Sequence, residues 1–137
     1  MKAKRVHTRA GSFPKFAVSR LLKSRAGKRW QVLCGDKNHW RIGFYSPGES
    51  RNQEVKQLEK HSCVELFMLL SGSQTLIIDD GKGERELKLK PMQPVMVRGW
   101  HCGYSPQGPH TGVSLVVERD RFSTIYRNRK VPKGISN

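Results

Sequence analysis

Between residues 29 and 118 the chain repeats short segments rich in apolar, aromatic and β-branched residues, and this repetition constrains the fold most strongly. Segments that recur about every 8–12 residues, separated by turns with Gly, Pro, Asn or Asp, are typical of β-sandwiches and β-barrels. They cover residues 29–35, 39–46, 53–61, 64–70, 74–79, 85–90, 94–99 and 112–118. The sequence therefore predicts an all-β fold, in which 64–70 and 74–79 form a hairpin across "SGS".

The positive charge of the chain, +15 in total, is concentrated at its two ends. Residues 1–35 contain ten Lys or Arg and no acid, and residues 123–137 contain four and no acid. Residues 36–122 are nearly neutral, with twelve basic and eleven acidic side chains. A chain of 137 residues is large enough for one domain with its own core. We therefore expect a basic N-terminal extension (1–28), a β-barrel (29–122) and a basic C-terminal tail (123–137).

The N-terminal extension allows two interpretations. Residues 12–27 have a candidate N-cap at Ser12 and scattered apolar side chains, which fits a short basic amphipathic helix. An acid-free segment with Arg and Ser also fits an organellar transit peptide. The run "GKRWQVL" leads directly into a strand without an evident processing break, which favours a segment retained in the protein.

The cysteines and the hydropathy pattern favour a cytoplasmic protein that is not inserted in a membrane. Cys34, Cys63 and Cys102 are an odd number without CxxC spacing, so a disulfide framework is not expected and a reducing compartment fits better. No stretch approaches the roughly 18 apolar residues that a membrane span requires. No hydrophobic signal-peptide core follows Met1.

One carboxylate stands at the head of the most apolar segment. Glu65 opens the run "ELFMLL" and follows His61 by four residues. Burying an unpaired carboxylate costs several kcal/mol, so a strand that carries Glu65 into the core needs a partner for it. A metal ion or a hydrogen-bonded histidine would both serve.

The stretch "EKHSCVELFMLLSG" resembles the first conserved motif of the cupin superfamily, G-x5-H-x-H-x(3,4)-E-x6-G. His61 falls on the second histidine, Glu65 on the glutamate and Gly72 on the closing glycine. His101 falls on the histidine of the second motif, G-x5-P-x-G-x2-H-x3-N, of which no other position matches. The first histidine of the first motif is replaced by Glu59.

This resemblance covers roughly residues 54–118 and implies a double-stranded β-helix, or jelly-roll barrel, with a divalent metal inside it. The implied ligands are His61, Glu65 and His101. Glu59 is a further candidate, because residues 59 and 61 share one face of a strand. Imidazole and carboxylate ligands suit Fe, Mn, Ni or Zn. Two alternatives stay open: His61 and Glu65 form a hydrogen-bonded pair without metal, and Glu59 belongs to a solvated strand end.

Three side chains near His101 are candidates for binding a small molecule. Trp100 and Tyr104 flank the histidine on a predicted turn and could line a pocket with apolar surface. Arg98 could clamp a carboxylate or phosphate group. Their alternatives are core aromatic residues and a surface arginine.

Cys63 and Cys102 lie beside the two candidate histidines. A thiolate ligand, a reactive thiol and a disulfide at the rim are the functional options, against two small buried residues.

We therefore expect a metal-binding cupin domain protein that binds or processes a small anionic organic molecule, without deciding whether it is an enzyme. A metal-free small-molecule-binding module is the first alternative. A nucleic-acid-associated protein that uses its basic ends is the second, disfavoured because no helix-turn-helix or zinc-finger pattern is present. The resemblance also implies a homodimer.

Overall fold

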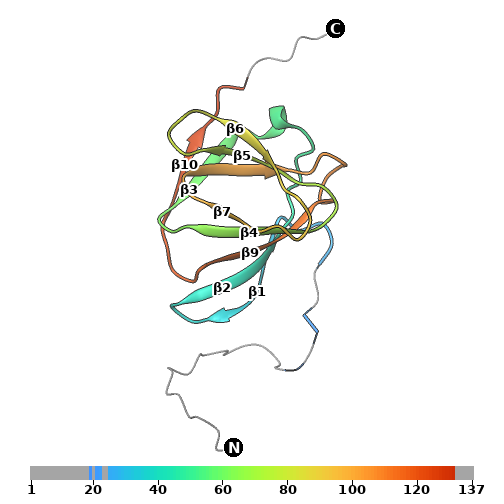
Figure 1. The fold of residues 1–137 in the computed structure, drawn as a ribbon, viewed down its shortest axis with the longest axis vertical. Coiled ribbons are helices and arrows are strands. Elements are labelled where there is room, and N and C mark those ends of the chain that lie inside the picture. Colours follow the sequence, from blue (N-terminus) through green and yellow to red (C-terminus); the bar gives the residue numbers. More distant parts are fainter. Residues whose placement is uncertain (1–18, 20, 23–24, 132–137) are drawn as a thin grey trace, which may run out of the picture.

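The computed structural model describes residues 19, 21–22 and 25–131, which form two five-stranded antiparallel sheets facing each other (Figure 1). The first sheet contains, in spatial order, β1 (Trp30–Asp36), β2 (Trp40–Tyr45), β9 (Val113–Arg119), β4 (Glu65–Ser71) and β7 (Val95–Val97). The second contains β10 (Thr124–Asn128), β3 (Gln57–His61), β8 (Trp100–Tyr104), β5 (Thr75–Asp79) and β6 (Arg85–Lys88). The predicted all-β jelly-roll architecture is confirmed.

Helical structure in the described residues is limited to one short 3-10 turn, η1 (Asn52–Glu54). None of these residues belongs to a helix long and apolar enough to cross a membrane. Most of the predicted helix at 12–27 lies outside the described part of the chain, as does most of the N-terminal extension, and the described residues 19, 21–22 and 25–27 are not helical.

Each of the eight predicted segments contains a strand, but two strands were not predicted. β8, which carries His101 at its second position, was interpreted as a turn. β10 was assigned to the basic tail, yet it pairs with β3 along its whole length, from Thr124 opposite His61 to Asn128 opposite Gln57. The barrel therefore extends past residue 122, the predicted boundary, and residues 132–137 lie outside the described part of the chain.

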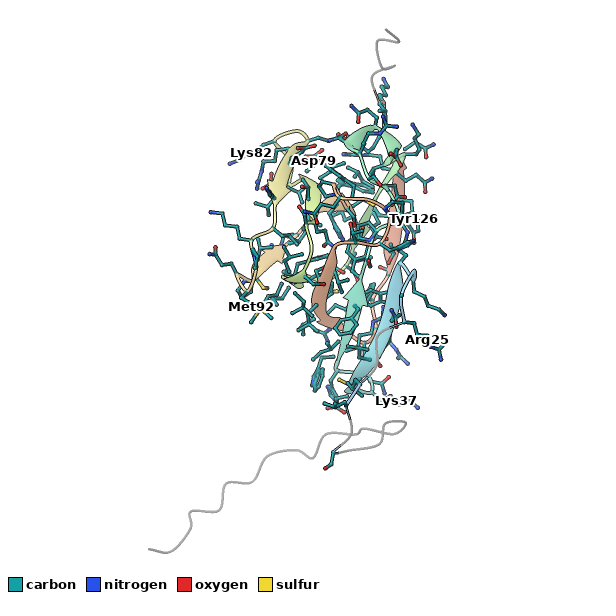
Figure 2. All side chains as sticks on the ribbon, turned by 90° about the vertical axis from the view of Figure 1, so that its right-hand side faces the viewer. Arg25, Lys37, Asp79, Lys82, Met92 and Tyr126 are labelled. Carbon is teal, nitrogen blue, oxygen red and sulfur yellow. The ribbon has the colours of Figure 1, made fainter. Side chains whose placement is uncertain are left out.

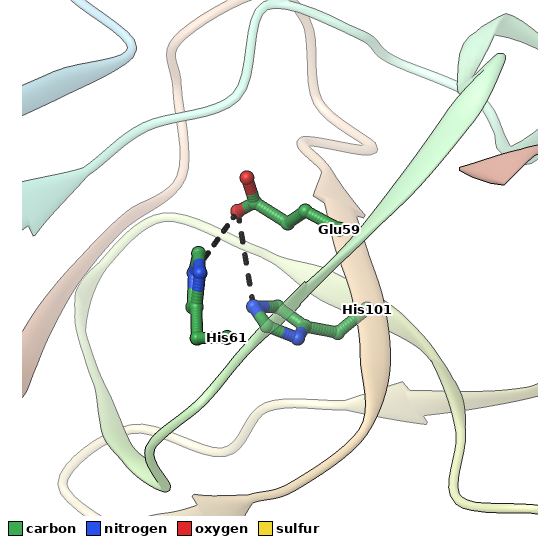
Figure 3. Close-up of side chains that lie close together, drawn as sticks. All are labelled: Glu59, His61 and His101. Carbon is green, nitrogen blue, oxygen red and sulfur yellow. Dashed lines mark ion pairs between the residues drawn. The ribbon is translucent and has the colours of Figure 1, made fainter. Parts of the chain in front are cut away.

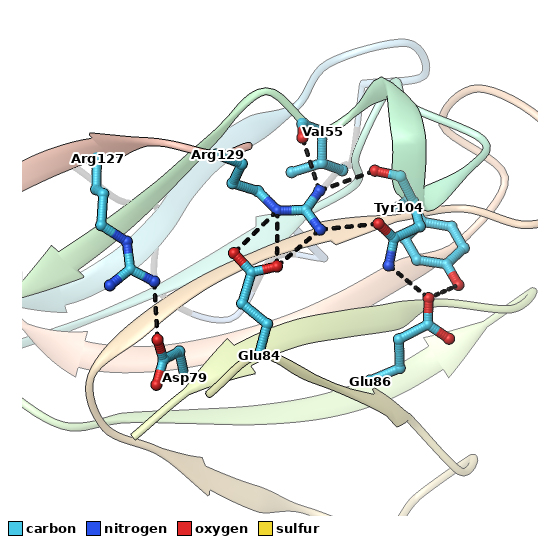
Figure 4. A network of polar contacts seen from close by, with 8 residues as sticks. Val55, Asp79, Glu84, Glu86, Tyr104, Arg127 and Arg129 are labelled. Carbon is cyan, nitrogen blue, oxygen red and sulfur yellow. Dashed lines mark hydrogen bonds and ion pairs between the residues drawn. The ribbon is translucent and has the colours of Figure 1, made fainter. Parts of the chain in front are cut away.

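Basic residues enter the β10 segment because acids on the second sheet pair with them (Figure 4). The Arg129 side chain is only 5% exposed, and its guanidinium donates to the Glu84 carboxylate, to the Asn52 side chain and to two backbone carbonyls. Arg127 donates to Asp79 over 2.9 Å. These contacts hold the end of β10 against the barrel.

The predicted hairpin between β4 and β5 is wrong. β4 pairs with β7 and β9 in the first sheet, whereas β5 pairs with β6 and β8 in the second. The connection at residues 72–74 therefore crosses from one sheet to the other. Gly72 has a φ of +67°, and a Cβ atom there would overlap the carbonyl oxygen of Thr111. The "SGS" turn is thus a close crossing of two backbones.

The core lies between the sheets, and its residues alternate along each strand as the pleat requires. Figure 2 shows side chains filling this space, whereas the labelled Lys82 and Met92 lie on the outside. On β4 the inward row is Glu65, Phe67 and Leu69. The buried apolar cluster consists of Phe67, Leu69, Leu76, Ile78, Leu89, Val97 and Val116.

We predict that Gly72→Ala destabilises the fold more than Gly81→Ala does. Both glycines have a positive φ, but a Cβ at Gly81 would meet nothing within 4 Å. Gly81→Ala should therefore lower the free energy of unfolding by about 1 kcal/mol through backbone strain. Gly72→Ala adds a backbone clash and should lower it by about 3 kcal/mol. Urea unfolding of the two variants measures this, and equal losses would contradict the crossing at residue 72.

Candidate metal centre

Three strands bring the four candidate ligands together inside the barrel. β3 carries Glu59 and His61 on the same face, and Glu59 pairs with His101 of the neighbouring β8. Glu65 is the first residue of β4 in the opposite sheet. Figure 3 shows the side chains of Glu59, His61 and His101 converging on one point. The predicted ligand residues thus meet at one place.

The ligand atoms of Glu59, His61 and His101 all lie within 4.8 Å of one another, close enough to hold one cation. The His61 Nε2 atom lies 3.6 Å from Glu59 Oε1 and 3.3 Å from Glu65 Oε1. The His101 Nε2 atom lies 3.8 Å from Glu59 Oε1 and 2.7 Å from Glu65 Oε2. Bonds of about 2.1 Å to one ion separate neighbouring ligand atoms by about 3 Å, close to most of these distances.

The most buried pair of the cluster has an unsatisfied geometry. Glu65 and His101 are each only 4% exposed. Although Glu65 Oε2 and His101 Nε2 lie 2.7 Å apart, they are not aligned as a hydrogen bond, and neither atom forms a hydrogen bond with another described residue. Buried polar atoms without a partner are rare in native structures and call for a missing proton, water or ion.

The second nitrogen of each imidazole is fixed by a neighbour. His101 Nδ1 lies 3.0 Å from the carbonyl oxygen of Gly99, so Nδ1 carries a proton and donates it. His61 Nδ1 lies 2.8 Å from Thr124 Oγ1 on β10. Contacts of this kind orient a metal-binding histidine and direct its Nε2 atom towards the ion. Since Nε2 of neutral His101 is then a bare lone pair facing a carboxylate oxygen, either a proton or a cation must lie between them.

The acid–base properties of the cluster reflect the same crowding. Burial would lower the pKa of His61, but the Glu59 and Glu65 carboxylates raise it to about 10. Burial likewise opposes the Glu65 carboxylate, yet His101 and His61 hold its pKa far below the usual range. The pKa of His101 is raised against burial, chiefly by Glu65. Without metal, the cluster therefore holds protons where an ion would sit.

A fifth residue, the acid Glu118, belongs to this cluster and was missed from the sequence. Glu118 ends the inward row of β9 after Ser114 and Val116, and it offers an oxygen within 4.8 Å of the ligand atoms of His61 and Glu65. Burial and the Glu65 carboxylate raise the pKa of Glu118 to about 7, although Arg41 opposes the shift. Glu118 follows Val116 by two residues, and this alternation could have predicted that its side chain faces the barrel interior.

The cluster lies on a cavity of about 600 Å³ between the sheets. Its walls combine charged residues with aromatic rings, among them Trp30, Tyr45, Phe67 and Phe122. The Phe122 ring packs on the His61 ring at a centroid distance of 4.7 Å. A partly apolar cavity with convergent polar groups suits a small molecule.

The three predicted substrate-binding residues do not line this cavity. Arg98 is exposed at the surface. Trp100 and Tyr104 lie one and three residues from His101 on β8, so side-chain alternation places them on the opposite face of the strand. There they pack against a second apolar cluster, which consists of Val55, Leu58 and Ile77. Their role in ligand binding stays a prediction.

The cysteine thiols offer no evident ligand. All three cysteines are free, and burial raises the pKa of the Cys63 and Cys102 thiols. A raised pKa favours the protonated thiol over the thiolate that metals bind. The candidate ligands are therefore imidazole nitrogens and carboxylate oxygens, a set that fits Fe(II), Mn, Ni or Zn.

Comparison with known proteins identifies the fold. No family model and no curated protein sequence matches the chain. Among solved structures, the hydroxypropylphosphonic acid epoxidase from S. wedmorenis matches with a TM-score of 0.53 and 14% identity, over 66% of this chain and 49% of that one. An Fe(II) structure of HppE matches with a TM-score of 0.54 and 12% identity, over 77% and 62%. The chain thus spans about half of the length of the epoxidase from S. wedmorenis, 49%.

Two cupin proteins match over most of their length. A cupin 2 domain-containing protein from Halorhodospira halophila matches with a TM-score of 0.53 and 19% identity, over 87% of this chain and 86% of that one. A cupin superfamily protein from Desulfitobacterium hafniense matches with a TM-score of 0.55 and 16% identity, over 80% and 99%. The chain has the cupin fold, and the resemblance read from the sequence is confirmed at that level.

We predict that His61 stabilises the metal-free fold below pH 7 and loses this effect in base. Its folded pKa of about 10 lies above its ordinary value of 6.5, so its contribution is complete below pH 6.5 and disappears as the pH rises through about 10. The difference in free energy of unfolding between wild type and His61→Gln, measured with chelator present, should therefore shrink from pH 6 to 10. His39→Gln, which changes an exposed histidine outside the cluster, is the control variant. A gap for His61→Gln that widens with pH would contradict the assignment.

Proposed function

We propose that this protein binds one divalent metal ion through His61, Glu65 and His101, with Glu59 as a fourth ligand, and binds or processes a small organic molecule beside it. The observation that carries this proposal is the buried contact of Glu65 Oε2 with His101 Nε2, two atoms 2.7 Å apart without hydrogen-bond alignment. The match to an Fe(II) structure of HppE supports it at the level of the fold.

The chain's own residues would position the ion and its ligand. Gly99 and Thr124 hold the two imidazole rings through their Nδ1 atoms, so that both Nε2 atoms point to the cluster. Phe67 and Phe122 place aromatic surface beside the rings and limit the access of water. A bound divalent ion with open positions would polarise a carbonyl or activate water.

A metal-free binding module is the second candidate, favoured by the raised pKa of His61. With a pKa of about 10, a protonated His61 could pair with Glu59 and Glu65 permanently. The two candidates differ in one measurable respect. A metal must displace the imidazole protons, whereas a permanent ion pair keeps them.

We predict that the purified chain, loaded with Fe(II), Mn(II), Ni(II) or Zn(II), retains about one ion after gel filtration. His61→Ala, Glu65→Ala and His101→Ala should each abolish retention, because each removes one of three ligands, while the all-β circular dichroism spectrum persists. His39→Gln, which changes an exposed histidine outside the cluster, should retain the ion.

Calorimetric titration with metal in buffers of different ionisation enthalpy measures how many protons are released when the metal binds, and so tests the same prediction independently. Since His61 is protonated in the metal-free chain at pH 7.5, binding should release at least about one proton per ion. Retention of none of the four metals by the wild type would leave the metal-free module as the function.

A further inference from the structure

A second charged group faces the cavity beside the ligand cluster, and no predicted site included it. Arg41 on β2 lines the cavity and donates through Nε to Glu118 Oε1 over 2.7 Å. Glu118 in turn offers an oxygen within 4.8 Å of the ligand atoms of His61 and Glu65. One carboxylate thus separates the Arg41 guanidinium from the candidate metal site.

The Arg41 guanidinium is held in place by two aromatic rings. Its Cζ atom lies 5.0 Å from the centroid of the Phe122 ring and 5.6 Å from that of Trp30. The Trp30 ring occupies this position because Gly43 on the neighbouring β2 has no side chain: a Cβ atom there would overlap the indole. Stacking fixes the plane of a guanidinium and leaves its edge free for hydrogen bonds.

Within the described part of the chain, most of the hydrogen-bonding capacity of Arg41 is unused. A guanidinium has five N–H donors, and among the described residues Arg41 uses only Nε. The side chain is 26% exposed and lines the cavity, so its remaining donors are accessible to a ligand there. The other cations of the cavity differ: Arg29 forms a two-oxygen contact with Glu49, and Lys56 donates to the backbone oxygen of Gln53.

We propose that Arg41 forms the subsite for the anionic group of the ligand, a carboxylate or a phosphate-type oxyanion, next to the metal ion. The terminal N–H groups match two oxygens of such a group, and the flanking rings orient the guanidinium for this contact. The subsite rests on the proposed metal function and assigns to Arg41 the role that the sequence suggested for Arg98.

The test uses the full chain loaded with Co(II), with the metal content of each variant measured first. Inorganic phosphate and acetate are the probes, and calorimetry together with the visible Co(II) spectrum reports their binding. Arg41→Met should weaken the binding of the better probe by at least about tenfold with unchanged metal content. Arg98→Met is the matched control, because it removes the same charge from the surface and should leave the affinity unchanged.

A second variant separates direct binding from an effect through Glu118. Arg41→Met/Glu118→Gln removes the carboxylate that Arg41 would leave unpaired, so affinity restored in the double variant would overturn the subsite. An unchanged affinity in Arg41→Met, or no binding of either probe by the loaded wild type, would overturn it as well. These outcomes leave metal retention intact, whereas failure of the proposed function appears earlier, as absence of metal.

Discussion

Two almost fully buried carboxylates, Glu65 and Glu118, determine how the rest of the barrel interior is arranged. Glu65 is the first and Glu118 the last inward-facing residue of its strand. Neither can stay charged in an apolar core without a partner. Glu65 meets the imidazoles of His61 and His101, and Glu118 meets Arg41. The second sheet supplies the two histidines and the first sheet supplies these two acids, so the charged cluster connects the two layers.

The cluster therefore joins the two sheets and also contains two buried polar atoms without a hydrogen-bond partner among the described residues. A buried ion pair contributes little net stability unless every polar atom is satisfied, and Glu65 Oε2 and His101 Nε2 are not aligned with each other. The surrounding groups that fix the imidazole rings, Gly99 and Thr124, act on the atoms that face away from the cluster. Histidine rings that are fixed from behind, beside polar atoms that lack a hydrogen bond, are typical of a site preorganised for a ligand.

The sequence predicted those parts of the molecule that depend on local pattern. Strand positions follow from alternation, and His61, Glu65 and His101 follow from motif spacing. Pairing partners could not be predicted, because the "SGS" connection looks like a hairpin and only the close approach of Gly72 to Thr111 makes it a crossing. Trp100 and Tyr104 were predicted to lie near a ligand because they are close to His101 in the sequence. Closeness in sequence does not show which face of β8 a side chain occupies. Glu118 and Arg41 are far apart in the sequence, and only the pairing of β2 with β9 makes them neighbours.

The crossing at Gly72 also bears on how the molecule folds. Because β4 finds its partners in β9 and β7, and β3 finds its partners in β10 and β8, most pairings close long loops of chain. Topologies of high contact order lose much chain entropy before their contacts form, and they fold slowly. The candidate ligands on β3, β4 and β8 are brought together only when these distant strands dock. An ion held by them would therefore act late on the folding route, slowing unfolding of the finished barrel more than it speeds its formation.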